Sequence, residues 1–222
     1  MGEKSKIEWT DATFNPWHGC TKVSPACDHC YAETFARRVG FSETGSKLPI
    51  WGKDAGRRFF GDAHWNEPLK WNKQAEREGV RKRVFCGSMC DVMEDSEDLQ
   101  HSRVRLYNLI DDTPHLDWLL LTKRPQNFRR FLPKTWLDRP RPNVWGMTTV
   151  ENADYLWRTE ELLRTPFAVR GLSIEPLLGP LTLDLAGIHW CIVGGESGPG
   201  ARPMHPQWVR GLRDQCCAAG AW

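Results

Sequence analysis

The sequence predicts an α/β protein in which helices cover a mostly parallel sheet. Three observations lead to this class. Short apolar runs rich in β-branched residues recur along the chain, a turn follows each run, and in most cases a helical pattern follows the turn. Such alternation favours parallel strands joined by helices. With 222 residues the chain has the length of one large domain with a substantial core, so we assign residues 1–222 to a single domain.

Five strands are predicted. Each predicted strand is a short apolar run bounded by turn residues. The five runs are residues 83–87, 117–121, 143–147, 167–174 and 189–193.

Four helices are predicted from apolar residues at helical spacing. The clearest begins at Pro206, which suits a first turn, and Gly220 ends it. Its apolar face consists of Val209, Leu212, Cys216 and Ala219. Residues 31–39, 96–110 and 153–163 show the same period. In the first of these, Tyr31, Phe35 and Val39 share a face and Gly40 is the stop signal.

Residues 41–82 differ from the rest of the chain. They are rich in Gly, Arg and Trp and show little apolar periodicity. We interpret them as a long insertion between the first helix and the next strand, with a role as a lid or in substrate contact.

Three cysteines near the amino terminus are the strongest chemical signal. Cys20, Cys27 and Cys30 have the spacing C-x6-C-x2-C, and a C-x2-C pair lets two thiolates reach one metal centre. Three thiolates on a [4Fe-4S] cluster would leave one iron free for a substrate or cofactor. A closed zinc site completed by His18 or His29 is the alternative, and a disulfide is a weaker one.

The remaining cysteines lie in apolar or helical surroundings. We interpret them as buried thiols in a reducing compartment. They are Cys86, Cys90, Cys191, Cys216 and Cys217.

Polar residues follow each predicted strand at its carboxyl end. In parallel α/β folds these ends meet at one edge, where ligands bind. We therefore expect one polar site, although any single Ser or Thr after a strand is more often a helix cap. Its members are Ser88 and Asp91; Thr122, Lys123 and Arg124; Thr148, Thr149, Glu151 and Asn152; Ser173 and Glu175; and Gly194, Gly195, Glu196, Ser197 and Arg202.

Composition limits the location of the protein. No run approaches the roughly 20 apolar residues of a membrane-spanning helix, and the first residues lack the apolar segment of a secretory signal. We therefore expect a cytoplasmic protein with no membrane contact. The sequence carries no signal of oligomeric state.

Net charge does not identify a partner, but tryptophan content favours nucleic acid. The 30 basic and 28 acidic residues leave a net charge of +2, which neither requires nor excludes an anionic ligand. The chain has 12 Trp, and Trp51 and Trp71 stand beside lysines. Aromatic faces next to cations suit bases and phosphates, although packing in the core is the commoner role of any one Trp. The arginines expected to contact phosphate are Arg57, Arg58, Arg124 and Arg202.

Five motifs together resemble a known family. They are Trp-His-Gly-Cys (17–20), Cys-Asp-His-Cys-Tyr-Ala (27–32), Leu-Leu-Thr-Lys-Arg-Pro (120–125), Ser-Ile-Glu-Pro-Leu-Leu-Gly-Pro (173–180) and Val-Gly-Gly-Glu-Ser-Gly-Pro-Gly-Ala-Arg-Pro-Met (193–204). This wording resembles a phage-associated three-cysteine-motif family of uncharacterised function, which is similar to the radical S-adenosylmethionine superfamily and, distantly, to spore photoproduct lyase. The resemblance implies a partial (β/α)6 TIM-like barrel with the cysteine loop before the first helix.

The resemblance also implies roles for individual residues. Cys20, Cys27 and Cys30 would hold a [4Fe-4S] cluster whose free iron binds the amino and carboxylate groups of S-adenosylmethionine. Lys123 would pair with the methionyl carboxylate, and Tyr31 would relay a hydrogen atom, unless it only packs on the barrel. The other residues implied in cofactor binding are Ser88, Thr149 and Glu175, and the triplet Gly194, Gly195 and Glu196 resembles a Gly-Gly-Glu motif of the superfamily.

The function expected from these observations is a radical S-adenosylmethionine enzyme that acts on DNA, RNA or a nucleotide, in repair or in base modification. Such an enzyme needs an external reductant. The alternative is a nucleic-acid-binding protein with a structural zinc at the three cysteines. A third possibility is a phage interaction protein built on a barrel that has lost its chemistry.

Overall fold

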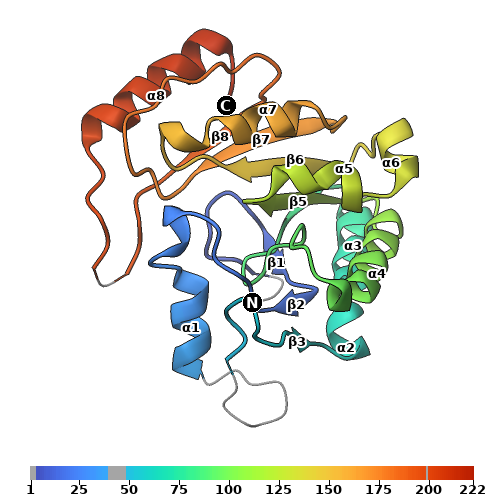
Figure 1. Cartoon of the computed structure of the whole chain (residues 1–222). Coiled ribbons are helices and arrows are strands. Elements are labelled where there is room, and N and C mark those ends of the chain that lie inside the picture. The colour runs from blue at the N-terminus through green and yellow to red at the C-terminus, as the bar shows by residue number, and fades with distance from the viewer. Residues whose placement is uncertain (1–3, 40–48, 199) are drawn as a thin grey trace.

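The computed structural model describes residues 4–39, 49–198 and 200–222 and is built on a six-stranded sheet whose pairs are all parallel (Figure 1). The predicted α/β class with a mostly parallel sheet is therefore confirmed. In sheet order the strands are β1 (Ala12–Phe14), β4 (Lys82–Cys86), β5 (Leu116–Thr122), β6 (Val144–Thr149), β7 (Val169–Ile174) and β8 (Trp190–Val193). Among the described residues no pairing joins the edge strands β1 and β8.

All five predicted strands are present, with small differences at their ends. Their apolar runs mark them because central strands are buried on both faces; in β5, Leu116, Trp118 and Leu120 are buried together with Leu119. Strand β1 is not among the predicted strands. Three residues are too few to show a period, and Thr13 interrupts the apolar run.

Helices cover one face of the sheet (Figure 1). The main ones are α3 (Glu67–Glu78), which contacts β4 and β5, α4 (Gln100–Asp111), and α7 (Trp157–Leu163), which contacts β6 and β7. Shorter elements join them: α5 (Phe128–Phe131), α6 (Lys134–Asp138) and the 3-10 turns η2 (Glu97–Leu99), η3 (Pro125–Asn127) and η4 (Ala153–Tyr155). The large apolar core lies mainly between these helices and the sheet.

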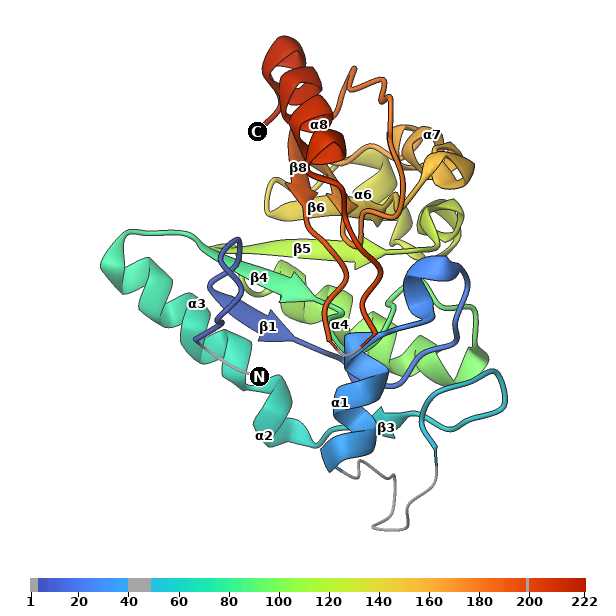
Figure 2. The same ribbon diagram turned by 90° about the vertical axis from the view of Figure 1, so that its left-hand side faces the viewer.

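Some strand side chains lie outside the main core and form a smaller apolar cluster. Leu119, Met147 and Ile192 form its centre, and the half-buried rings of Trp145 and Trp190 pack beside them. The N-terminal segment adds Trp9, whose ring stacks at a tilt on Phe85 with centroids 4.7 Å apart. Figure 2 shows this segment passing over β4 and β5.

Helices α8 (Pro206–Ala219) and α1 (Tyr31–Val39) begin and end where they are predicted, but α1 buries the opposite face. Tyr31, Phe35 and Val39 are exposed, whereas Ala32 and Ala36 are buried. The reason is position: α1 lies near the carboxyl ends of the strands (Figure 2), where its small alanines allow close packing. The stop signal Gly40 lies outside the described residues.

The segment predicted to be an insertion holds regular structure in its second half. The short helix α2 (Asp62–Trp65) precedes α3, which buries Trp71 and Ala75 against the sheet. The apolar residues of α3 show no clear helical period in the sequence, because its buried face also contains Pro68 and Asn72. Upstream, β2 (Trp17–His18) pairs with β3 (Arg58–Phe59) in a small antiparallel sheet. Residues 41–48 lie outside the described part.

No helix within the described residues is both long and apolar enough to cross a membrane.

Candidate functional site

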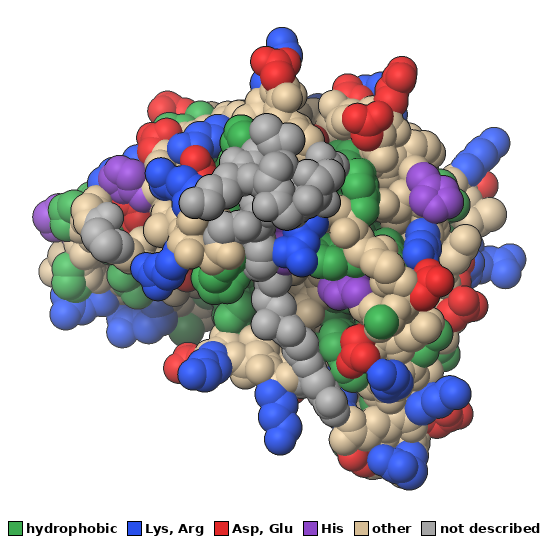
Figure 3. All heavy atoms as spheres, turned by 90° about the horizontal axis from the view of Figure 1, so that it is seen from below, with side chains coloured by type: hydrophobic (Ala, Val, Ile, Leu, Met, Phe, Trp, Pro, Cys, Tyr) green, Lys and Arg blue, Asp and Glu red, His purple; other side chains and the backbone are tan. Residues whose placement is uncertain are grey.

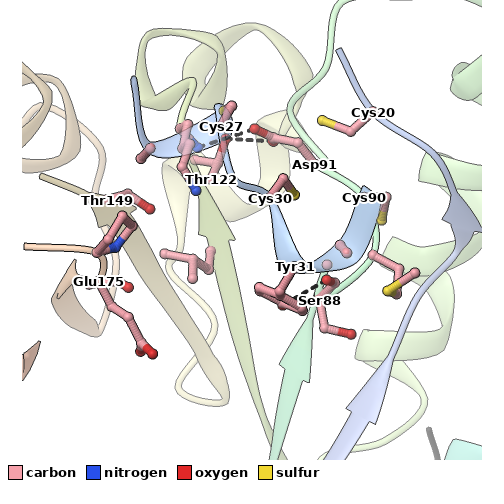
Figure 4. A pocket seen from close by; sticks show the side chains of 18 of the residues that line it. Cys20, Cys27, Cys30, Tyr31, Ser88, Cys90, Asp91, Thr122, Thr149 and Glu175 are labelled. Atoms are coloured by element: carbon pink, nitrogen blue, oxygen red, sulfur yellow. Dashed lines mark hydrogen bonds between the residues drawn. The ribbon is translucent and has the colours of Figure 1, made fainter. Parts of the chain in front are cut away.

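A cavity of about 350 Å³ lies at the carboxyl ends of the parallel strands. Its walls come from the cysteine loop and from the loops after β4, β5, β6, β7 and β8 (Figure 4). This is the edge at which α/β folds bind ligands. The residues that the resemblance implies in cluster binding, cofactor binding or hydrogen-atom transfer all line the cavity except Gly194. Four further members of the predicted polar site, Thr148, Glu151, Asn152 and Arg202, do not line it.

The three cysteines reach the cavity from three kinds of local structure. Cys20 follows β2 and forms a single β-bridge with Trp51. Cys27 ends the 3-10 turn η1 (Pro25–Cys27), and Cys30 directly precedes α1. Gly19 makes this path possible: its φ is +110°, and a Cβ there would lie 2.2 Å from the carbonyl oxygen of Ile50.

The sulfur of Cys20 lies beside a buried cation. Arg124 Nη1 is 3.7 Å from Cys20 Sγ. Burial raises the pKa of the Cys20 thiol to about 12, and the Arg124 guanidinium opposes that rise. Within the part of the chain that the structure describes, Cys20 is thus the one cysteine of the loop whose sulfur accepts a hydrogen bond from a charged donor.

Asp91 organises the wall behind Cys20. Its carboxylate accepts hydrogen bonds from Thr122 Oγ1 (2.6 Å), the Lys123 backbone N (3.1 Å) and Arg124 Nη1 (2.8 Å). Burial acts against its charged form, but Arg124 and these hydrogen bonds outweigh burial, so the pKa of Asp91 lies below its ordinary value. The loops after β4 and β5 are therefore tied together at the cavity.

Tyr31 and Ser88 are joined on another wall (Figure 4). The Tyr31 hydroxyl donates to the Ser88 carbonyl oxygen at 2.8 Å. Although the ring as a whole is half exposed, burial of its hydroxyl raises the pKa of Tyr31. Ser88 Oγ accepts a hydrogen bond from Asn15 Nδ2 at 2.9 Å.

Thr149 and Lys123 line the cavity, and among the described residues neither side chain has a hydrogen-bond or ion-pair partner. Thr149 Oγ1 is fully buried and has no hydrogen-bond partner within the described part of the chain. In the same part, no carboxylate lies within ion-pair distance of the Lys123 ammonium. A buried hydroxyl without a partner costs free energy, so a bound ligand is the expected partner of Thr149.

Glu175 extends into the open part of the cavity. Burial raises its pKa, and the Lys123 ammonium opposes that rise. Gly194 does not line the cavity, but it lets Glu175 lie there: a Cβ at Gly194 would be 2.9 Å from Glu175 Cδ. Its role in the structure is to make room for a lining side chain.

Glu196 lines the cavity and belongs to a separate hydrogen-bond network. It pairs with Arg202 and accepts from His29 Nδ1 at 2.8 Å. The hydrogen bond from Arg202 is the main reason that the pKa of Glu196 falls to about 2. Arg202 also donates to the Pro25 carbonyl oxygen at 2.7 Å, which connects the loop after β8 to the cysteine loop.

Two predicted members of the polar site, Glu151 and Asn152, stabilise the fold and do not line the cavity. Glu151 is buried in an ion pair with Arg158, and Asn152 caps η4 by accepting from the Asp154 backbone N.

The histidines considered as zinc ligands have other neighbours. His18 is buried outside the cavity, where burial is the main cause that lowers its pKa to about 3. His29 lines the cavity and binds Glu196. Among the described residues, no three His, Cys, Asp or Glu side chains lie close enough together to hold one metal ion.

The expectation that arginines at this edge track phosphate is wrong for two of them. The side chains of Arg57 and Arg124 are each only 8% exposed, and they form ion pairs with Glu94 and Asp91. Trp71 is buried in α3 and is unable to stack on a base. Cys217, predicted to be buried, is exposed. The spacing of these residues along the chain contains no information about which of them finds a buried partner.

The cavity also contains residues that the sequence analysis does not assign to it. Cys90 lines it, and its thiol donates to Asn15 Oδ1 at 3.8 Å. Trp9 and Phe85 form an aromatic wall. The position of Cys90 after a strand end is the signal that could have placed it here, whereas nothing local to Trp9 indicates its place.

Comparison with known proteins identifies one family. A family model described as protein of unknown function (DUF5131) matches residues 4–221. No curated protein and no solved structure matches the chain.

Proposed function

The chain belongs to the family described as protein of unknown function (DUF5131), and on the chemistry of its cavity we propose that it is a radical S-adenosylmethionine enzyme with a [4Fe-4S] cluster at Cys20, Cys27 and Cys30. The proposal rests in part on the resemblance of the sequence motifs to that superfamily. A parallel six-stranded sheet with the cysteine loop between its first strand and first helix is consistent with a partial (β/α)6 barrel.

One observation carries the proposal: three cysteines of a single loop line the same cavity as Thr149, whose buried hydroxyl has no hydrogen-bond partner among residues 4–39, 49–198 and 200–222. Thiolates are the usual protein ligands of iron-sulfur clusters. The three sulfurs surround a cavity instead of converging on one point, which suits a cluster whose ligands bind different iron atoms better than a single zinc ion. The donor set and the room beside it fit the cluster and its cosubstrate.

When bound, the cluster would supply the electron that cleaves S-adenosylmethionine to a radical able to take hydrogen from a substrate. The chain's own residues would hold the reactants. Lys123 suits the methionyl carboxylate, because its residue lines the cavity and no carboxylate of the described residues lies within ion-pair distance of its ammonium. Thr149 and Glu175 offer a hydroxyl and a carboxylate for the amino and ribose groups.

Cofactor binding tests this assignment. With dithionite and S-adenosylmethionine, the anaerobically reconstituted protein should release 5′-deoxyadenosine and methionine. Lys123→Ala should weaken S-adenosylmethionine binding by about 1.5 to 3 kcal/mol, the range for a hydrogen bond to a charged group. Equilibrium dialysis measures the affinity, and Lys70→Ala on the exposed side of α3 is the matched control.

Two results would count against the proposal. Equal cofactor affinity of the unaltered protein and Lys123→Ala would remove Lys123 from the site. Zinc in the purified protein, with no cleavage of S-adenosylmethionine under any reducing condition, would favour the structural-zinc alternative.

A nucleic acid or nucleotide is the proposed substrate, on the strength of the aromatic lining. Trp9, Trp51 and Phe85 line the cavity, as does the exposed Lys22, whose ammonium also pairs with Glu33 at 3.0 Å. The face shown in Figure 3 carries no comparable signal, because its Lys and Arg lie among Asp and Glu. Recognition is therefore expected at the cavity and not along a basic stripe.

The substrate proposal predicts different effects for two variants. Trp51→Ala should weaken binding of single-stranded DNA or RNA by about 1 to 3 kcal/mol and leave the salt dependence unchanged, because stacking does not depend on counterions. Lys22→Ala should lower the slope of log affinity against log salt by about 1. Fluorescence anisotropy measures both. Absence of any nucleic-acid binding would direct the search to small molecules or peptides.

A further inference from the structure

Two buried arginines hold the residue that follows Cys20. Arg57 Nη2 donates to Thr21 Oγ1 at 3.0 Å, and Arg124 Nη2 donates to the Thr21 carbonyl oxygen at 2.7 Å. Both side chains are 8% exposed. The cysteine loop is therefore anchored at Thr21 from two sides.

The two arginines are themselves held in the same manner. Arg57 forms a buried ion pair with Glu94, with Nη2 and Oε1 2.8 Å apart. Arg124 forms a buried ion pair with Asp91, with Nη1 and Oδ2 also 2.8 Å apart. In burial, charge and loop contact they are close to equivalent.

Their other contacts differ, and one difference concerns a cysteine. Arg124 Nη2 also lies 3.8 Å from Glu94 Oε1. Arg124 Nη1 lies 3.7 Å from the sulfur of Cys20. Among the described contacts of Arg57 there is no sulfur: its other partners are the carbonyl oxygens of Ile50, Gly52, Ala55 and Gly56. Of this matched pair, only Arg124 places a cation on a cysteine of the cavity.

We infer that Arg124 is a positioning residue for Cys20 that donates a charge-assisted hydrogen bond to its sulfur and thereby raises the reduction potential of the cluster. The inference rests on the proposed function, since it needs a cluster at the three cysteines. It makes the three cysteine ligands unequal, with Cys20 the one held by a fixed cation.

Electrostatics explains why Arg124 should raise, and not lower, the reduction potential of the cluster. Reduction adds a negative charge to a cluster that thiolates already make negative. A neighbouring guanidinium stabilises that added charge, and arginine remains protonated even when buried. Hydrogen bonds to the sulfurs are among the features that set cluster potentials. Burial excludes the water that would otherwise screen the interaction.

The experiment compares the two arginines. The unaltered protein, Arg124→Gln, Arg124→Lys and Arg57→Gln are reconstituted anaerobically with iron and sulfide, and iron content is measured. Each is then titrated in a redox cell with detection by electron paramagnetic resonance, without S-adenosylmethionine. The readout is the midpoint potential, and Arg57→Gln reports any shift that loss of loop anchoring causes by itself.

We expect Arg124→Gln to lower the midpoint potential by at least about 59 mV, equivalent to a tenfold change in a one-electron equilibrium. Arg124→Lys, which keeps the charge, should lie between this value and that of the unaltered protein. Arg57→Gln should leave the potential unchanged. An equal shift in Arg57→Gln, or no shift in Arg124→Gln, would overturn the inference.

A double variant guards against misfolding and against a competing explanation. Arg124→Gln leaves Asp91 buried without its cation, whereas Asp91→Asn with Arg124→Gln removes both charges. A lowered potential in the double variant supports the N–H···S contact. If the double variant instead has the original potential, the unpaired Asp91 caused the shift and the inference is wrong. Failure of the unaltered protein to take up iron and sulfide would overturn the proposed function itself.

Discussion

Replacement of Cys20, Cys27 or Cys30 by Ala should abolish the brown iron-sulfur chromophore of anaerobically reconstituted protein. Each sulfur lines the cavity, and a cluster held by three protein ligands loses a third of them with any one substitution. Visible absorption and iron and sulfide analysis measure the loss. We expect all three variants to contain little or no iron.

The Cys90→Ala variant is the most informative control for this result. It lines the same cavity, but its thiol donates to Asn15 Oδ1, so it is already satisfied by the protein. Cys90→Ala should keep the full iron content, as should Cys217→Ala at the exposed end of α8. Loss of iron in Cys90→Ala with retention in Cys27→Ala would mean that the sequence motif does not define the ligands.

Replacement of Glu151 by Ala should destabilise the fold by about 3 to 5 kcal/mol, because it leaves the Arg158 guanidinium buried without its carboxylate. The two side chains are 0% and 1% exposed, and their Oε2 and Nη1 atoms are 2.8 Å apart. Arg158 also donates to the carbonyl oxygen of Thr149 at 3.0 Å. The variant should therefore disturb the cavity wall as well as the fold. Urea denaturation followed by circular dichroism measures the free energy of unfolding.

Glu161, which lies on α7 together with Arg158, provides the comparison. Its ion pair with Arg164 is solvent-accessible, with side chains 25% and 61% exposed. Glu161→Ala should change the free energy of unfolding by no more than about 1 kcal/mol, as for other surface ion pairs. Equal losses in the two variants would show that burial of the Glu151–Arg158 pair has no special energetic weight.

Features that depend on neighbouring residues could be predicted from the sequence. The apolar runs gave five of the six sheet strands, and the Pro206 and Gly220 signals placed α8. Clustering of polar residues at strand ends predicted the cavity, because parallel strands bring their carboxyl ends to one edge whatever their loops do. Helix α3 could not be predicted with equal ease, since Asn72 within its buried face breaks the apolar pattern.

The sequence by itself therefore determined the α/β class, the parallel strands and the cysteine loop facing a polar edge, since local spacing and period encode these. Only the tertiary structure decided which side chains meet across long separations. Thr21 and Arg124 are 103 residues apart in the chain, and their contact brings a cation to Cys20. Arg57 is buried for the same kind of reason, by Glu94 at a distance of 37 residues. Periodicity shows which face of an element avoids water, but the choice of a buried partner depends on packing between elements, which no local pattern contains.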